Sequence, residues 1–134
     1  MKKLYTFLLL LFFISCSKEE IVRNAVINAM TSGQWKVVIF KNGSTDVTTD
    51  FAPYKFQFKE NLSVDAINNT TVEKTGSWTA DPNAKTITAT FTNANSTLSL
   101  LNGTWLITDS GWTYVEANQT VNGELRILRL EKII

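Results

Sequence analysis

The sequence contains no histidine. Histidine is the side chain that most often acts as a general base near neutral pH, and it is the commonest zinc ligand. Its absence excludes Ser–His–Asp triads and Cys–His nucleophiles. The chain also has a single cysteine, Cys16, so it can form no disulfide within itself. Carboxylates are the groups that remain for acid–base chemistry.

Net charge is small as well. Thirteen Lys and Arg residues stand against 12 Asp and Glu residues, which gives a formal charge of +1. A chain so close to neutral has no electrostatic footprint for nucleic acid or for anionic lipid. We therefore expect no nucleic-acid partner. The length of 134 residues is enough for one domain and not for two.

The N-terminus has the layout of a secretory signal. Met1-Lys2-Lys3 supplies positive charge, and residues 4–13 are almost wholly apolar. This run is too short to span a bilayer as a helix, which needs about 20 apolar residues. Residues 14–16 then resemble a bacterial lipobox, with Ile14 and Ser15 in place of its commoner Leu and Ala or Gly. The resemblance implies cleavage before Cys16 and acylation of its sulfur and its new amino terminus.

The alternative is an ordinary secretory peptide in which a cysteine falls near the cleavage site. Acylation is favoured because an exported protein with one unpaired thiol is prone to intermolecular disulfides. The acyl chains would anchor the protein in the membrane, since each buried CH₂ contributes about 0.8 kcal/mol. Removal of Lys2 and Lys3 with the signal changes the formal charge from +1 to −1. We expect a signal peptide over residues 1–15, an acylated cysteine and tether over 16–20, and the folded domain over 21–134.

The residues after Cys16 carry a second resemblance. Lys18, Glu19 and Glu20 are similar to the surface-export signal of some Gram-negative lipoproteins, a Lys followed by two acidic residues behind the acylated cysteine. The resemblance implies an outer-membrane lipoprotein displayed at the cell surface. In the alternative, these residues are a short solvated charge run and the protein lies on the periplasmic face of the outer membrane.

The folded domain begins with a helical segment and continues as short strands. Residues 20–30 have apolar side chains at helical spacing and predict a short N-terminal helix. From residue 34 onward, aromatic and β-branched residues alternate with polar ones between Gly, Asn, Asp and Pro turn signals. The pattern predicts about eight strands, near residues 34–39, 54–59, 62–66, 76–80, 87–91, 105–107, 112–116 and 124–131. Short loops without a long crossover predict an all-β fold, an antiparallel up-and-down barrel that leaves no exposed edges.

Three motifs resemble bacterial lipocalin-like lipoproteins over roughly residues 31–132. Gly33-Gln34-Trp35 is similar to the Gly-x-Trp signature of the first lipocalin strand. Gly76-Ser77-Trp78 resembles the middle hairpin of these proteins, and residues 101–105 resemble their Leu-x-Gly-x-Trp strand start. The resemblance implies that Trp35 packs at the closed end of the barrel beneath a basic residue of the last strand, Arg126 or Arg129, in a cation–π contact. It also implies a small or partly filled cavity, because this chain is shorter than many lipocalins.

The aromatic residues have two interpretations. In the first, they line a pocket for a small apolar or amphipathic ligand, for which the candidates are Tyr54, Phe56, Trp78, Trp112 and Tyr114. Trp112 and Tyr114 are the preferred positions, because they follow a turn at which a barrel mouth is expected. In the second interpretation the rings are core, since small eight-stranded barrels can fill their interior with side chains.

The carboxylates give no sign of an enzyme. A glycosidase needs two carboxylates facing each other across a cleft. Here they are scattered and are explained better as solvated groups, namely Asp46, Asp50, Asp65, Glu73, Asp109 and Glu116. We expect no catalytic residues, no metal site and no cofactor.

Three hypotheses for function remain, and the least favoured of them is an enzyme that uses carboxylates only. The first is a monomeric, lipid-anchored, lipocalin-like protein that binds a small apolar or amphipathic ligand. The second is a structural or accessory surface protein whose filled barrel binds a partner protein or a glycan. The volume of the interior separates the first two, because ligand pockets usually exceed about 300 Å³.

Overall fold

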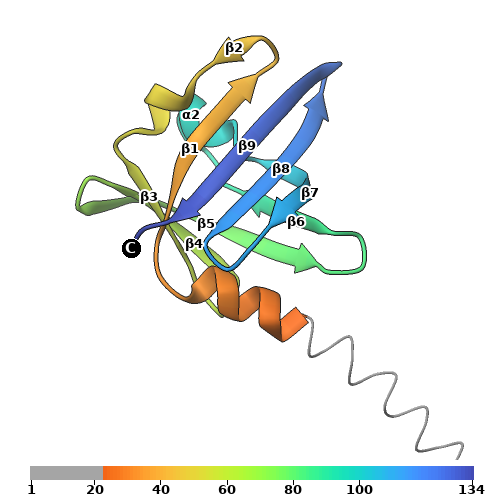
Figure 1. Ribbon diagram of the computed structural model, residues 1–134. Helices are drawn as coiled ribbons and strands as arrows, with labels where there is room; N and C mark the ends of the chain where they lie inside the picture. Colours follow the sequence, from red (N-terminus) through yellow and green to blue (C-terminus); the bar gives the residue numbers. More distant parts are fainter. Residues whose placement is uncertain (1–22) are drawn as a thin grey trace, which may run out of the picture.

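Eight strands form one antiparallel sheet that closes into a barrel (Figure 1). The structure is a computed structural model that describes residues 23–134. Each barrel strand pairs with its neighbours along the chain, and the last pairs back with the first from Trp35↔Lys132 to Asn42↔Arg126. The strands are β1 (Trp35–Asn42), β3 (Tyr54–Phe58), β4 (Ser63–Asn68), β5 (Thr71–Asp81), β6 (Thr86–Thr90), β7 (Gly103–Ser110), β8 (Tyr114–Val121) and β9 (Glu124–Lys132). The predicted up-and-down barrel is confirmed.

Three short elements interrupt the meander. Strand β2 (Thr45–Asp46) forms a hairpin with the end of β1, and the 3-10 helix η1 (Thr48–Phe51) follows it. Helix α2 (Ser96–Ser99) lies between β6 and β7. Asn95 caps α2, because its Oδ1 accepts a hydrogen bond from the Leu98 N–H at 2.8 Å. The apolar residues 98–101 therefore belong to α2 and the turn after it.

The N-terminal helix, α1, is described over residues 23–31, where it confirms the predicted helix. Met30 is buried against the barrel, and Thr31 Oγ1 donates a hydrogen bond to Ile27 O at 2.7 Å. Gly33, with a φ of +103°, then turns the chain into β1. Glycine adopts this left-handed conformation without the steric cost of a Cβ. Within residues 23–134, none of the helices has the length and apolarity needed to cross a membrane.

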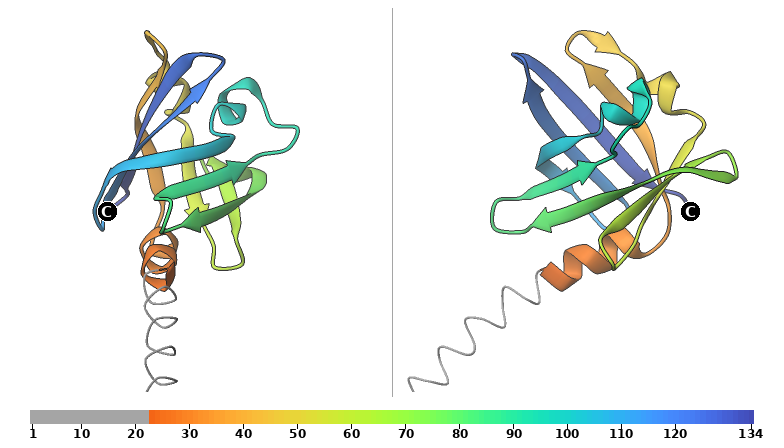
Figure 2. Two further views of the ribbon diagram at one scale, coloured as in Figure 1. Left: turned by 90° about the vertical axis from the view of Figure 1, so that its right-hand side faces the viewer. Right: turned by 180° about the vertical axis from the view of Figure 1, so that it is seen from behind.

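The barrel has two different ends (Figures 1 and 2). At one end, called the N-helix end, α1 lies beside the β3–β4, β5–β6 and β7–β8 turns. At the other, called the α2 end, lie α2, β2 and the β8–β9 turn. The termini of the described chain, residue 23 and Ile134, both belong to the N-helix end of the molecule.

The interior is packed with aromatic side chains. Tyr54, Phe56 and Phe58 alternate along β3 and all point into the core, as their spacing predicts. Rings from different strands meet there: Phe58 and Trp78 have centroids 5.3 Å apart and are nearly perpendicular, a favourable arrangement. The remaining core residues of the barrel and its caps are Met30, Trp35, Val37, Phe40, Phe51, Val64, Ala66, Phe91, Leu98, Leu101, Trp105, Val115, Ala117, Leu128 and Leu130.

Side chains close the barrel at the α2 end. Phe51 of η1 and Leu98 of α2 are both fully buried there, and Phe51 stacks on Phe40 with ring centroids 5.0 Å apart. Arg126 of β9 reaches across this end, with Nη1 donating to Leu100 O at 3.4 Å and Nε donating to Asn42 Oδ1 at 3.2 Å. These contacts leave no wide mouth at the end opposite α1.

Candidate functional site

The barrel interior holds a cavity of only about 50 Å³. Its lining is apolar and comes from Met30, Phe56, Phe58, Val64, Ile87, Ala89, Phe91, Leu101, Trp105, Val115, Ala117, Leu128 and Leu130. Pockets for drug-sized ligands usually have about 300–1,000 Å³. The interior therefore has no room for a ligand of that size unless core side chains move.

Trp35 lies at the N-helix end, as the lipocalin resemblance implies. Its ring is fully buried, and its Nε1–H donates a hydrogen bond to Met30 O at 2.9 Å. The cation above the ring is Lys132, whose Nζ lies 5.1 Å from the ring centroid. The expectation of Arg126 or Arg129 in this place is wrong.

Strand register explains the difference. Trp35 begins β1 and pairs with Lys132 at the end of β9, while Arg129 lies opposite Ile39 beyond a register shift between Val37 and Ile39. Arg126 lies at the α2 end. Because β1 and β9 are antiparallel, the first residue of β1 faces the last residue of β9, and this pairing brings Lys132 to Trp35.

The predicted ligand-binding residues are not brought together. Tyr54, Phe56 and Trp78 are core residues, and Trp78 Nε1–H donates to Lys59 O at 3.1 Å. Trp112 is 60% exposed in the β7–β8 turn, and Tyr114 starts β8 outside the core. Lys132 Nζ lies 4.5 Å from the Trp112 ring and 5.1 Å from Trp35, so Trp112 is at the N-helix end and not at an open mouth.

A groove of about 370 Å³ lies beside α1 at the N-helix end of the barrel. Val26 of α1, Ala80 of β5 and Ile107 of β7 supply apolar surface, and the charged residues Asp81, Lys85 and Asp109 contribute to its rim. The groove forms where β7 extends past Thr86, the first residue of β6. Ile107 N–H donates to Lys85 O at 2.8 Å, and the β7 residues beyond it pair only with β8.

A polar cluster joins β3, β5 and the segment before α2. Tyr54 Oη donates to Glu73 Oε2 at 2.7 Å, and Asn95 Nδ2 donates to Tyr54 Oη at 2.8 Å. Asn68 Nδ2 donates to Glu73 Oε1 at 3.0 Å. The bond from Asn68, followed by that from Tyr54, lowers the pKa of Glu73, whereas burial and the Glu73 carboxylate raise the pKa of Tyr54. A surface pocket of about 330 Å³ adjoins this cluster, but the cluster's groups already satisfy one another.

The outer surface of β7, β8, β9 and β1 carries exposed aliphatic side chains. We call it the aliphatic face and define it by Ile39, Leu106, Leu125 and Ile127, each more than a third exposed. The register places them near one another: Asn118 pairs with Leu106 on one side and Ile127 on the other, and Ile39 pairs with Arg129. Unlike the groove beside α1, this surface lies on the outside of paired strands.

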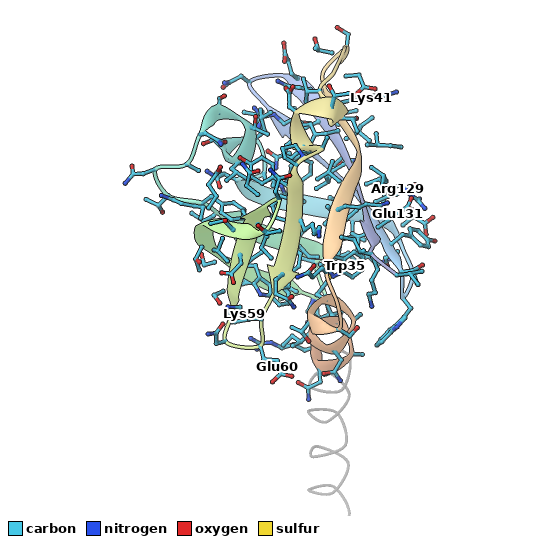
Figure 3. The ribbon with its side chains drawn as sticks, turned by 90° about the vertical axis from the view of Figure 1, so that its left-hand side faces the viewer. Trp35, Lys41, Lys59, Glu60, Arg129 and Glu131 are labelled. Carbon is cyan, nitrogen blue, oxygen red and sulfur yellow. The ribbon has the colours of Figure 1, made fainter. Side chains whose placement is uncertain are left out.

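Arg129 lies within the aliphatic face and is held by its neighbours. Its Nη1 bonds the Glu116 carboxylate, and its Nε donates to Glu131 Oε2 at 3.0 Å. Its guanidinium carbon lies 4.6 Å from the centroid of the Tyr114 ring. Figure 3 shows Arg129 and Glu131 side by side on the outside of the barrel. The guanidinium is therefore paired with two carboxylates, and the three groups together carry a formal charge of −1.

Asp65 of β4 is the site of a local ion pair. It is 7% exposed, its Oδ2 lies 2.8 Å from Lys59 Nζ, and its Oδ1 accepts a hydrogen bond from Thr75 Oγ1 at 2.7 Å. The hydrogen bond from Lys59, followed by that from Thr75, lowers the pKa of Asp65. These bonds tie the β3–β4 turn, where Figure 3 shows Lys59 and Glu60, to β5.

We expect Asp65→Asn to destabilise the protein at about pH 7 and the loss to shrink in acid. The folded pKa of Asp65 lies below the unfolded one, so its ionised form contributes stability above about pH 4 that disappears as the pH falls through the folded pKa. Urea unfolding of both proteins at about pH 7 and about pH 3 measures this. A difference in unfolding free energy that stays constant between these pH values would contradict a role for the charge.

Residues 23–134 contain no group of three or more Asp, Glu, His or Cys side chains placed to hold a metal ion. The predicted acylation site Cys16 and the predicted export residues Lys18, Glu19 and Glu20 lie outside the described residues. They stay predictions from the sequence.

Comparison with solved structures supports the fold. The barrel is similar to the crystal structure of a DUF4847 family protein from Bacteroides vulgatus, with a TM-score of 0.53. The sequences are 14% identical, and the match covers 79% of this chain and 96% of that one. No family model and no curated protein matches the sequence. At this level of identity the likeness shows a small β-barrel domain and leaves function to be argued from the site.

Proposed function

We propose that this chain is an outer-membrane lipoprotein, acylated on Cys16, whose filled barrel binds a partner protein through the aliphatic face without catalysis. The observation that carries the proposal is the interior cavity of about 50 Å³, which moves any binding function to the outside of the barrel. Lys18, Glu19 and Glu20 are proposed as the signal that directs the protein to the cell surface, and the periplasmic face is the alternative location.

The lipocalin likeness is part of the same proposal. Gly33 makes the turn into β1, and Trp35 is buried at the N-helix end beneath a basic residue of the last strand. These are the features that the resemblance implies, with Lys132 in the basic position. The filled interior supports an accessory role over ligand transport, because the volume that would hold a ligand is occupied by side chains.

The aliphatic face suits a protein partner. Its exposed aliphatic residues adjoin Arg129, which packs on the Tyr114 ring, and arginine and tyrosine recur at the centre of protein interfaces. Because Glu116 and Glu131 already pair with Arg129, a partner need not supply an anion for the guanidinium. A buried and unpaired charge would otherwise oppose association.

Site-specific photo-crosslinking in living cells tests this face. A photoreactive amino acid at Ile127, which is 40% exposed, should give one discrete cross-linked product whose partner mass spectrometry identifies. The matched control is Val72 on β5, which is 49% exposed and lies outside the face. The product should disappear when Leu125 is also changed to Asp. Equal products from both positions, or none from Ile127, would contradict the proposed face.

A second candidate function is the binding of a small apolar or amphipathic ligand in the groove beside α1. The volume of about 370 Å³ and the apolar surface from Val26, Ala80 and Ile107 favour it. Native mass spectrometry of protein purified from its own host distinguishes the two candidates. A small molecule that stays bound to wild-type protein and is lost from Ile107→Asp would support the groove.

The membrane anchor is tested by Cys16→Ser. The variant should fold normally but leave the membrane fraction or accumulate uncleaved, because it cannot be acylated at that position. Fractionation of cells, with mass spectrometry of the mature N-terminus, measures this. A Cys16→Ser protein that fractionates and is processed as the wild type would show that the lipobox prediction is wrong.

A further inference from the structure

Trp112 differs from the other three tryptophans. Those three are buried, and each indole N–H donates to a backbone carbonyl: Trp35 to Met30, Trp78 to Lys59 and Trp105 to Leu101. Trp112 is 60% exposed, and among the described residues its indole N–H has no acceptor. The fold therefore accounts for three tryptophans and leaves the fourth, large and apolar, in solvent.

Trp112 and Lys132 form a small mixed surface, which we call the Trp112 rim. Lys132 Nζ lies 4.5 Å from the Trp112 ring centroid, and Lys132 N–H donates to Thr113 O at 2.8 Å. Ile133 is 37% exposed, and its N–H donates to Gln34 O at 2.8 Å. Backbone hydrogen bonds thus hold Lys132 and Ile133 to the β7–β8 turn and to the start of β1.

The rim lies at the end of the barrel from which the chain leads back to Cys16. Lys132 Nζ donates to Ser32 Oγ at 2.8 Å, directly after α1. The described part of α1, nine residues, has a length of about 13 Å. Cys16 precedes residue 23 by seven positions, which can span at most about 25 Å. A lipid on Cys16 therefore keeps the N-helix end, and with it the rim, within a few tens of ångströms of the bilayer.

We propose that the Trp112 rim docks on the lipid surface and orients the barrel on its membrane. This inference rests on the proposed acylation of Cys16. Tryptophan combines an apolar ring with an N–H donor and is enriched at the membrane–water interface. A lysine beside it buries its carbon chain while its ammonium group reaches the headgroups.

Docking by the rim would leave the strands of the aliphatic face running away from the bilayer, since the β8–β9 turn lies at the opposite end of the barrel (Figure 2). Leu125, next to that turn, is 46% exposed and should stay in water. The two ends of the barrel are therefore expected to differ in their access to lipid.

The test uses a protein that begins at Cys16 and so contains every described residue. Its single thiol is coupled to a maleimide lipid. The vesicles consist of phosphatidylcholine with brominated acyl chains, which quench tryptophan fluorescence on contact. This chemical anchor does not depend on acylation by the cell. The vesicle experiment therefore tests docking alone, and the Cys16→Ser experiment in cells tests acylation alone. The variants are Trp112→Phe, and Trp112→Phe combined with Leu125→Trp, which restores the number of tryptophans.

The wild type should show quenching together with a blue shift of emission, and Trp112→Phe should lose both. The double variant should stay unquenched, because its new tryptophan lies at the α2 end. Equal quenching of the wild type and Trp112→Phe would overturn the proposal, as would quenching of the double variant to the level of the wild type. Circular dichroism of each variant confirms the fold before coupling.

Discussion

Replacing Trp35 with alanine should lower the free energy of unfolding by about 3–5 kcal/mol. The ring is 0% exposed and packs between α1 and the barrel. Its removal would leave a cavity at the N-helix end, take the donor away from Met30 O, and remove the ring beneath Lys132. Domains of this size are stable by about 5–15 kcal/mol, so the loss would bring the protein close to unfolding at ambient temperature. Urea unfolding followed by far-ultraviolet circular dichroism measures it.

Two control variants separate the causes. Trp35→Phe keeps most of the apolar contact and loses the hydrogen bond to Met30, so it should cost less than Trp35→Ala. Trp112→Ala removes a ring of the same kind from an exposed position and should change stability by about 0.5 kcal/mol or less. If Trp35→Ala were as stable as Trp112→Ala, the closure of the barrel at this end would not depend on Trp35.

Gly76→Ala should cost about 2–3 kcal/mol, although it adds a single methyl group. A Cβ at Gly76 would lie 2.4 Å from the backbone oxygen of Thr90 and 2.8 Å from Cδ1 of Phe91. The glycine makes room for the Phe91 ring, which is buried and packs against Phe56. Because the nearer contact is to backbone, relief of the clash requires β5 and β6 to move apart. The change in urea midpoint relative to the wild type measures this cost.

Gly111→Ala is the matched control for this substitution. Neither glycine has a positive φ, so backbone strain does not distinguish them. The three atoms nearest to a Cβ at Gly111 would all belong to the Tyr114 side chain, the closest at 2.7 Å, and this ring lies at the surface, where it can move aside. We expect the smaller loss from Gly111→Ala. Equal losses from both variants would show that the Thr90 backbone is free to adjust.

The strands and their closure into a barrel follow from local pattern. Tyr54, Phe56 and Phe58 show the principle, since side chains two apart in a strand point to one face and the buried face must be apolar. Short turns between successive strands leave the antiparallel neighbour as the nearest partner. A meander of eight strands has two open edges until the first and last pair, which is what β1 and β9 do.

The choice of cation over Trp35 could not be made from pattern alone. Arg126, Arg129 and Lys132 all belong to β9, and the cation that covers Trp35 depends on the pairing register of β1 and β9. The register shift between Val37 and Ile39 changes that pairing partway along the strand. Sequence reasoning favoured arginine, and the structure places Lys132 there because it lies opposite Trp35.

The positions of the predicted ligand-binding residues could not be derived from the sequence pattern either. Trp78 and Trp112 have the same side chain and both lie near a turn, yet Trp78 is 1% exposed and Trp112 is 60% exposed. The difference arises because Trp78 meets Phe58 inside the barrel while Trp112 meets Lys132 outside it. Contacts between residues so far apart in the chain are not encoded in the spacing of either one.

The residue pattern alone therefore specifies the class of fold and the absence of histidine and thiol chemistry from the folded domain. It also predicts a lipid-attachment site at Cys16. These depend on composition and on a period of two residues, which are properties of short segments. Tertiary structure decides whether the barrel is open or filled, because the volume of about 50 Å³ is what remains after side chains from eight strands and two end caps have packed together. It also decides that Trp112 is left outside the core, at the N-helix end of the barrel.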